Sequence, residues 1–326
     1  MKNTVTYPAQ HGKPANFKSR GDKWRTALSG LEGAYADSTL RAYRADMQAF
    51  EDWCRKARRR ALPATPQTVA AFIAHETESC SAATLKRRLA GIRKVHRLLR
   101  MENPVTDEEV VIAMRRALRA KRARPQQALG LTNDLRDQLI AACPNTLAGK
   151  RDRAMIALGY DTLCRRAELV ALRVEDLRPP ANGSAQILIR RSKNDPYGEG
   201  RLGYVSPESL KLVHAWLNAA GIDAGYIFRA VRHDRAGNRP LHPYSVNRLL
   251  KQAARAAGLS AQAIEHLSGH SMRVGAAQDL IVSGLGVLSI MQAGGWKTMN
   301  VVGRYVENAN LAPLLRRARD GRTPLP

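Results

Sequence analysis

The chain is poor in cysteine, in aromatic residues and in acidic side chains. Aromatic residues make up 5% of its 326 positions, and its 4 cysteines are Cys54, Cys80, Cys143 and Cys164. They lie far apart and form no CxxC pair, which excludes a zinc ribbon or a disulfide scaffold. The sequence therefore predicts reduced thiols, as in a cytosolic protein.

Long apolar runs are also missing. Residues 1–20 are polar and lack the apolar stretch of a signal peptide. The longest apolar run, residues 280–293, is interrupted by serine, glycine and glutamine, which suits two buried helices better than a membrane span. We expect a cytoplasmic protein that neither is exported nor binds a membrane.

Basic residues are abundant instead. Lys and Arg number 53 against 28 Asp and Glu, giving a formal net charge of +25 and a pI near 10.7. Residues 1–130 hold 26 basic and 12 acidic side chains, net +14, and residues 131–326 hold 27 and 16, net +11. Such a charge predicts a polyanionic partner, nucleic acid first, and its spread over both halves favours a clamp around a duplex.

The chain is long enough for two domains. Residues 1–35 are polar and predict a flexible arm, whereas residues 36–124 predict a helical bundle. The basic segment 119–125 ends in proline and precedes new elements, so the second domain is expected over residues 125–326. The helices expected in the first domain cover residues 39–60, 69–75, 81–100 and 107–119.

The second domain is expected to be rich in helices and to carry a small antiparallel sheet. A strand over residues 185–190 leads through a charged tip, SKNDPYGEGR, into a second strand near Tyr204. The fold class is therefore mainly α, with two domains. The helices expected here cover residues 132–142, 148–160, 165–173, 207–220, 243–257, 270–283, 286–293 and 309–319.

Two blocks pair arginine with a second polar residue at helical spacing. TLCRRAELVALRVEDL places Arg165 three residues before Glu168, and GHSMRVGAA places His270 three residues before Arg273. Taken singly, these are an intrahelical ion pair and an ordinary histidine. Together, two guanidinium forks and an imidazole can hold the oxygens of one phosphate, because the forks match phosphate geometry and remain charged.

Three further residues are ordinary when taken singly. Lys193 lies at the tip of the predicted hairpin, where a solvated lysine is the usual finding, and AGGWKTMNVVGRYVEN places Trp296 nine residues before Tyr305. A single tyrosine is most often half-buried packing. The sequence contains no metal-binding cluster, P-loop or GxSxG motif, so we expect no cofactor, no metal and no small-molecule substrate.

In this order, the blocks resemble those of the tyrosine recombinase (phage integrase) family. The likeness is carried by RRAELVALRVEDL, GHSMRVGAA and IMQAGGW, and it covers the second domain throughout. KVHRLL and AMRRALR in the first domain look like the family's core-binding domain. The resemblance implies a DNA strand transferase that works without ATP or metal.

The resemblance also implies a role for each residue. Tyr305 would attack the scissile phosphorus and leave a 3′-phosphotyrosine with a free 5′-hydroxyl. Phosphate oxygens would be bound by Arg165, Arg273, His270 and Trp296, with Glu168 orienting the arginines and Lys193 protonating the leaving oxygen. Two departures stand out: Arg166 duplicates the first arginine, which leaves either residue open for that role, and Trp296 replaces the more common histidine.

Recognition of a target site is the least readable feature. We hypothesise that two helices enter successive major grooves of the duplex. The alternative is that their charged side chains contact only phosphates or solvent. The residues proposed to contact DNA are Lys86, Arg87, Arg88, Arg93, Lys94, Asn247, Arg248 and Lys251.

The assembly and the reaction follow from the resemblance as well. It implies a homotetramer on double-stranded DNA with inverted-repeat sites, recombination through a Holliday junction, and a C-terminal helix docked in trans; a helix folded back in cis is the alternative. Two other functions remain open at this point, a non-catalytic architectural DNA-binding protein on the same fold and a relaxing type IB topoisomerase.

Overall fold

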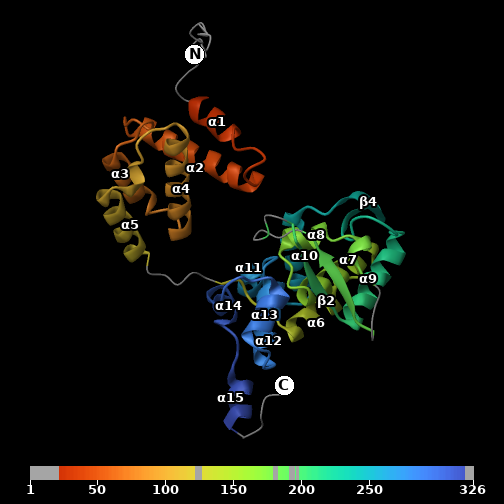
Figure 1. Cartoon of the computed structure of the whole chain (residues 1–326). Coiled ribbons are helices and arrows are strands. Elements are labelled where there is room, and N and C mark those ends of the chain that lie inside the picture. Colours follow the sequence, from red (N-terminus) through yellow and green to blue (C-terminus); the bar gives the residue numbers. More distant parts are fainter. Residues whose placement is uncertain (1–21, 122–126, 179–182, 191–194, 196–197, 320–326) are drawn as a thin grey trace, which may run out of the picture. The chain divides into compact units, whose positions relative to one another are not determined.

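The computed structural model describes residues 22–121, 127–178, 183–190, 195 and 198–319. It divides into two compact units, Met1–Pro125 and Gln126–Pro326. Figure 1 shows both units as groups of helices, with strands only in the second among the parts described. The predicted fold class, mainly α with a small antiparallel sheet, is confirmed. None of the described helices combines the length and the apolar composition needed to cross a membrane.

The first unit is a bundle of helices around one apolar core. The core is formed by side chains such as Phe50, Phe72, Ile92 and Val95. Helices α3, α4 and α5 each begin at a polar cap, Thr65, Ser81 or Asp107, whose side chain accepts a backbone N–H of the first turn. The helices are α1 (Asp22–Ser29), α2 (Asp37–Lys56), α3 (Pro66–Glu76), α4 (Ala82–Leu98) and α5 (Glu108–Ala120).

Helix α1 corrects one prediction. The flexible arm was expected to extend to residue 35, but Asp22–Ser29 is helical, and Trp24 and Leu28 are 1% and 0% exposed within the core. Two large apolar side chains four residues apart are enough to hold a short helix on the bundle. The helical bundle therefore begins at least fourteen residues before the predicted start at residue 36.

The second unit surrounds a larger core. Helix α7 supplies Ala154, Met155, Ile156 and Leu158 to it. Trp216 of α9 also lies in this core and donates its indole N–H to the Ile227 carbonyl at 2.8 Å. The helices are α6 (Asn133–Ala142), α7 (Leu147–Asp161), α8 (Arg166–Ala171), α9 (Pro207–Ala220), α10 (Pro243–Ala256), α11 (Ala261–His266), α12 (Ser271–Val282), α13 (Val287–Gly294), α14 (Met299–Val306) and α15 (Ala312–Arg319).

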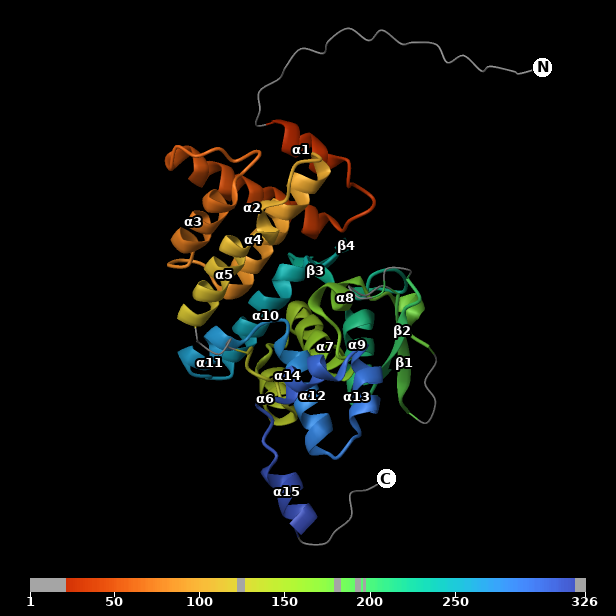
Figure 2. The ribbon, with the colours of Figure 1, turned by 60° about the vertical axis from the view of Figure 1, so that its left-hand side comes forward.

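Two antiparallel hairpins complete this unit. Strand β1 (Ala185–Ile189) pairs with β2 (Arg201–Val205), with Ala185 opposite Val205 and Ile189 opposite Arg201, as Figure 2 shows at the edge of the unit. The second hairpin, β3 (Arg229–Arg232) and β4 (Arg235–Pro240), was not predicted, nor were α11 and α14.

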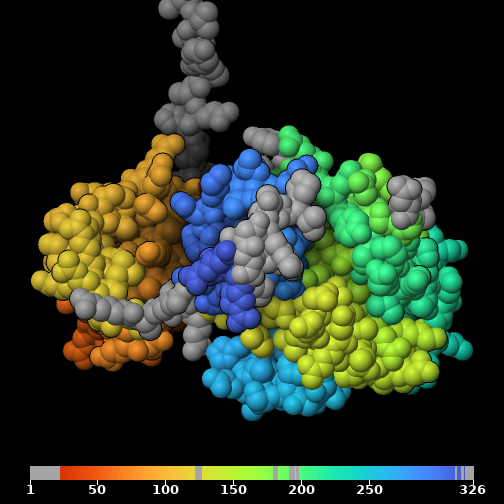
Figure 3. Space-filling model, turned by 90° about the horizontal axis from the view of Figure 1, so that it is seen from below, coloured from red at the N-terminus to blue at the C-terminus, as the bar shows by residue number. Residues whose placement is uncertain are grey.

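The C-terminal helices cover one face of the second unit. Helix α12 packs against α6, α7, α13 and α14. In Figure 3 the blue surface of these last helices borders the yellow surface of α6 and the start of α7. Sequence segments more than a hundred residues apart are thereby brought side by side, and the polar blocks that resemble the family's motifs meet where these segments join.

Candidate active site

Five side chains from four places in the chain meet beside a small apolar cluster. Leu163, Ala277, Ile290 and Val302 are buried in this cluster together with Trp296, and the ring of Tyr305 packs against it. Arg165 precedes α8, His270 and Arg273 lie at the start of α12, Trp296 follows α13, and Tyr305 is on α14. The predicted residues from the two arginine blocks and the Gly-Gly-Trp-to-Tyr segment are therefore brought together.

Arg273 lies at the centre of the site. It is fully buried, with its guanidinium carbon 4.1 Å from the centroid of the Trp296 ring and 5.6 Å from that of Tyr305. Nη2 donates to the Gly294 carbonyl at 2.7 Å and Nη1 donates to the Leu163 carbonyl. Burial, followed by repulsion from Arg165, lowers the pKa of Arg273 to about 10, so it stays charged at neutral pH.

The carboxylate of Glu168 holds Arg165 from two sides. Its Oε2 accepts the Arg165 backbone N–H at 3.0 Å, and its Oε1 accepts from Arg165 Nη1 at 2.7 Å. Glu168 is 5% exposed, so this pair is sheltered from solvent screening. Glu168 acts on the site through Arg165, as a positioning residue.

Arg166 points to a different neighbour. Its guanidinium carbon is 4.7 Å from the ring centroid of Tyr244, and that ring stacks on the imidazole of His242. Tyr244 is 67% exposed. The duplicated arginines are therefore engaged differently, Arg165 with the buried Glu168 and Arg166 with an exposed tyrosine.

His270 and Tyr305 form a hydrogen-bonded pair. The Tyr305 hydroxyl lies 2.7 Å from His270 Nε2, with the two ring centroids 5.1 Å apart. Desolvation in the site, then repulsion from Arg273, Arg165 and Arg166, lowers the pKa of His270 to about 4. His270 is partly exposed to solvent, but the nearby guanidinium charges still disfavour protonation of its ring. The imidazole is therefore neutral at pH 7. A neutral Nε2 without a proton can accept a hydrogen bond from the phenol and so hold its oxygen in place.

The two glycines before Trp296 make room for its ring and for the Arg201 side chain. A Cβ atom on Gly294 would lie 2.1 Å from a Trp296 ring carbon. Gly295 has φ +62°, and a Cβ there would lie 2.9 Å from Arg201 Cδ. Trp296 is 4% exposed, and its indole nitrogen and Arg273 Nε are buried without a hydrogen-bond partner among the residues that the structure describes. Buried unpaired donors cost about 1–3 kcal/mol each, and these two belong to side chains that pack against each other in the site.

Lys193 lies outside the described residues. The strands that flank it, β1 and β2, are described, and so is Asp195, whose carboxylate accepts the backbone N–H groups of Gly198, Glu199 and Gly200 at 2.8–3.1 Å. These three bonds lower the pKa of Asp195. Asp195 thus organises the part of the hairpin tip that follows residue 197.

Two positioning residues could not be recognised from the sequence. Arg201 of β2 donates to the Ala293 carbonyl at 2.7 Å and to the Thr162 carbonyl at 2.8 Å, and it lies 3.8 Å from Glu168. Asn247 was predicted to contact DNA, but its Oδ1 accepts the Gly269 N–H at 2.7 Å and so holds the turn before His270. Neither position carries a local motif, because each partner comes from a distant segment.

The other residues predicted to contact DNA divide into two groups. Four of them have contacts within the protein. Arg88 pairs with Glu76 and is 18% exposed, and Arg87 lies 2.9 Å from the Asp46 carboxylate. Lys94 donates to the Tyr35 hydroxyl, and Lys251 donates to the Glu265 carbonyl. The remaining residues, Lys86, Arg93 and Arg248, are exposed. The guanidinium of Arg88 also lies over the Phe72 ring, so the contacts of this side chain are with its own unit.

Comparisons with known proteins agree with this geometry. The phage integrase family model matches residues 130–311, and the model of the phage integrase N-terminal SAM-like domain matches residues 24–103. The integrase/recombinase XerD homologue of Selenomonas ruminantium is 33% identical over 300 residues, covering 86% of this chain and 84% of its own length. Recombinase Cre of Escherichia phage P1 is 27% identical over 311 residues, covering 88% and 90%.

A solved structure has the same fold. A lambda integrase tetramer bound to a Holliday junction superimposes with a TM-score of 0.62 at 18% identity, covering 91% of this chain and 79% of that one. The family resemblance predicted from the sequence is confirmed. The chain belongs to the phage integrase family, the tyrosine recombinases.

Proposed function

We propose that this protein is a site-specific DNA recombinase that cleaves and rejoins strands through Tyr305. The observation that carries the proposal is the pairing of the Tyr305 hydroxyl with a neutral His270, 2.7 Å away, beside the buried Arg273. Attack of the phenolate oxygen on phosphorus forms a 3′-phosphotyrosine and breaks the bond to the 5′-oxygen, which leaves as a hydroxyl after protonation. Lys193 is the proposed donor of that proton.

The remaining polar groups bind the phosphate in this proposal. Arg165, Arg273 and the Trp296 indole N–H would donate to the non-bridging oxygens and stabilise the charge of the pentacoordinate transition state. The two buried donors without partners support this assignment, since a phosphate oxygen would satisfy each of them. The phosphotyrosyl bond retains the energy of the phosphodiester, so rejoining requires neither ATP nor a metal.

The test is the capture of a covalent adduct. The wild type, Tyr305→Phe and Tyr204→Phe are incubated with nicked suicide duplexes drawn from the DNA that flanks the gene, and adducts are separated on denaturing gels. Tyr204 is a matched control because its ring is 56% exposed on β2. We expect an adduct with the wild type and Tyr204→Phe but not with Tyr305→Phe. Tight binding of all three without any adduct would instead indicate a non-catalytic DNA-binding protein.

The outcome on supercoiled plasmid separates recombination from relaxation. A recombinase yields products in which strands of two sites have been exchanged, through a Holliday junction. Relaxation of plasmids with one site and no exchange between two sites would indicate type IB topoisomerase activity. The similarity to Recombinase Cre over 88% of the chain supports exchange.

We also propose that the protein acts in the cytoplasm and that exposed basic residues of both units contact duplex DNA at inverted-repeat sites. Lys86 and Arg93 on α4 and Arg248 on α10 are the residues most available. Substituting a base-reading residue should relax sequence preference, whereas substituting a phosphate-binding residue should weaken all sites equally. Arg88→Ala is the control for lost packing, because that side chain is engaged by Glu76.

The proposed assembly is a homotetramer in which α15 docks on the neighbouring copy. Leu311 and Leu315 are 40% and 56% exposed at this helix, and the solved lambda integrase is a tetramer on a Holliday junction. An exposed apolar patch such as this pair of leucines is more stable when a second chain covers it. A truncation before Asn310 that leaves synapsis and cleavage intact would contradict the arrangement.

A further inference from the structure

The carboxyl end of α14 is held by side-chain amides from elsewhere in the unit. The last carbonyls of a helix have no partner within it and need donors from outside. Gln127 Nε2 donates to the Tyr305 carbonyl at 3.2 Å and also to the Arg304 carbonyl. Gln278 of α12 is a second, weaker donor, with its Nε2 3.4 Å from the Tyr305 carbonyl. The backbone of Tyr305 is therefore fixed by a residue 178 positions earlier in the chain.

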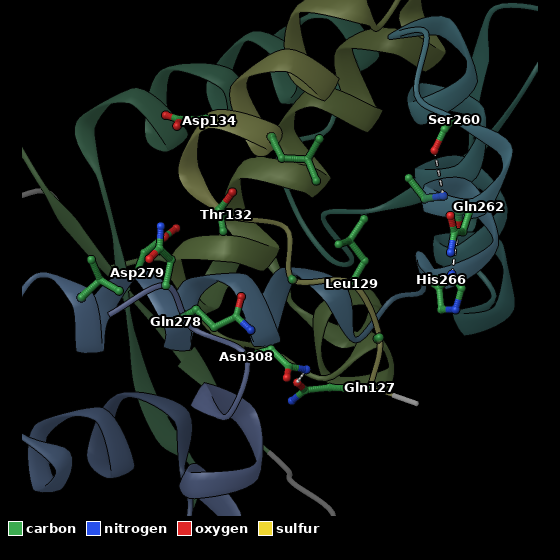
Figure 4. Close-up of a pocket in the computed structure, with 16 residues that line it drawn as sticks. Gln127, Leu129, Thr132, Asp134, Ser260, Gln262, His266, Gln278, Asp279 and Asn308 are labelled. Atoms are coloured by element: carbon green, nitrogen blue, oxygen red, sulfur yellow. Dashed lines mark hydrogen bonds between the residues drawn. The ribbon is translucent and has the colours of Figure 1, made fainter. Parts of the chain in front are cut away.

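The orientation of the Gln127 amide is itself fixed. Asn308 Nδ2 donates to Gln127 Oε1 at 2.7 Å, so the oxygen faces Asn308 and the nitrogen faces the two carbonyls. Figure 4 shows this pair at one side of a pocket of about 850 Å³, with Gln278 nearby and Gln262 and His266 on another element of its wall. The amide thus bridges both sides of the point where α14 ends.

The segment that carries Gln127 is hydrogen-bonded to the end of α11 and to the start of α12. The backbone N–H groups of Leu129 and Leu131 donate to the carbonyls of His266 and Ser271 at 3.0 and 2.8 Å. A Cβ atom on Gly275 would lie 1.9 Å from the Leu131 carbonyl oxygen, so segment and helix are in direct contact. Arg273 lies on the same helix. Gln127 therefore ties the helix of the nucleophile to the helix of the phosphate-binding arginine.

We propose that Gln127 is a positioning residue for Tyr305, acting through its amide N–H donors. The inference rests on the proposed function. Without the donors, the Tyr305 carbonyl keeps the longer bond from Gln278, the last turn of α14 is held less firmly, and the phenol hydroxyl leaves the position set by His270. Displacing a reacting group by about 1 Å costs about a hundredfold in rate. Gln127 is the second residue of the second unit.

The donors are tested by two substitutions of similar length. Gln127→Glu keeps an acceptor for Asn308 but loses the N–H donors, and Gln127→Lys keeps a donor for the carbonyls but loses the acceptor. Gln262→Glu and Gln262→Lys, on α11 across the same pocket, carry the matching changes of charge. Adduct formation under single turnover and the Kd for the same duplex are measured for all four and for the wild type.

We expect Gln127→Glu to form the adduct at least tenfold more slowly than Gln262→Glu, with Kd within twofold, and Gln127→Lys to retain more of the rate than Gln127→Glu. Activation of the phosphate is measured separately, with hydrogen peroxide as a diffusible nucleophile in the Tyr305→Phe background. Cleavage by peroxide should be equal with and without Gln127→Glu, because the phosphate-binding residues remain in place.

Two results would overturn the inference. One is adduct formation by Gln127→Glu within twofold of Gln262→Glu. The other is an equal loss of peroxide cleavage, which would mean that the substitution damages the whole site. Failure of the proposed function is read separately, as the absence of any Tyr305-dependent adduct with the wild-type protein.

Discussion

The adjacent arginines at the start of α8 offer a sharp test of the site, because they have the same chemistry and different partners. Arg165 is held by the buried Glu168 through Nη1 at 2.7 Å, and its side chain is 20% exposed. Arg166 lies over the exposed ring of Tyr244. We predict that Arg165→Ala abolishes most cleavage, whereas Arg166→Ala leaves most of it.

The expected magnitudes follow from these contacts. Removing one preorganised donor to the transition-state oxygens costs about 2.7–4 kcal/mol, or about 10²–10³ in rate. Arg165→Ala also removes the 2.7 Å partner of the buried Glu168 and leaves that carboxylate with the more distant Arg201, at 3.8 Å. Arg166→Ala removes an exposed cation–π contact worth about 0.5–1 kcal/mol, which corresponds to a change in rate of about fivefold or less.

The assay is single-turnover formation of the covalent adduct on a suicide duplex, with Kd measured in the same buffer at two salt concentrations. Both variants lose one positive charge, so the salt dependence of binding serves as an internal control. A larger loss of the adduct rate in Arg166→Ala than in Arg165→Ala would refute the assignment, and Arg166 would become the phosphate-binding residue.

Three further predictions concern titration and the leaving group. His270 should stay neutral from pH 8 to pH 5 in an NMR titration, and Arg165→Ala should raise its pKa by removing a nearby cation; titration near pH 6.5 in the wild type would contradict this. His96 is fully buried, and burial lowers its pKa. As the pH falls below about 6.5, His96 is therefore protonated in the unfolded chain before it is protonated in the folded protein, and the stability of the fold decreases. The slope of Tm between pH 7 and pH 5 should therefore be smaller in His96→Gln, and an unchanged slope would exclude His96 as the cause. Lys193→Ala should cleave slowly on normal DNA but at the wild-type rate on a 5′-bridging phosphorothiolate, because a thiolate leaves without protonation; a persistent defect would argue against a general-acid role.

Much of the fold was predictable because its signals are local. Helix α9 was predicted with its observed bounds, Pro207–Ala220, since Ser206 caps its start and Gly221, at φ +60°, ends it. The β3–β4 hairpin was missed for the opposite reason. Its strands are rich in arginine and mostly exposed, and its turn uses His233 and Asp234 at φ of about +50°, with no glycine.

Helix α14 shows a second kind of limit. Its eight residues include Gly303, and its start at Thr298 has no side-chain cap bond, so the local sequence gives little sign of a helix. The helix is held by Val302 in the apolar cluster and by amides at its end, all of them contacts with distant segments. The motif identified Tyr305, but only the fold shows the support that places its hydroxyl.

The same distinction decides what a basic residue does in this protein. Arg87 and Arg88 are adjacent on α4 and look equivalent in the sequence. In the structure, Arg88 packs between Glu76 and the Phe72 ring, whereas Arg87 forms an ion pair with Asp46. The local pattern reports a cation on a helix, and a carboxylate from another helix determines whether that cation remains available to DNA. A net charge of +25 therefore identifies the class of partner, because it sums over all such pairs, but it cannot assign the contact to individual residues. Positions whose carboxylate partners are far away in the sequence can be assigned only once the fold is known.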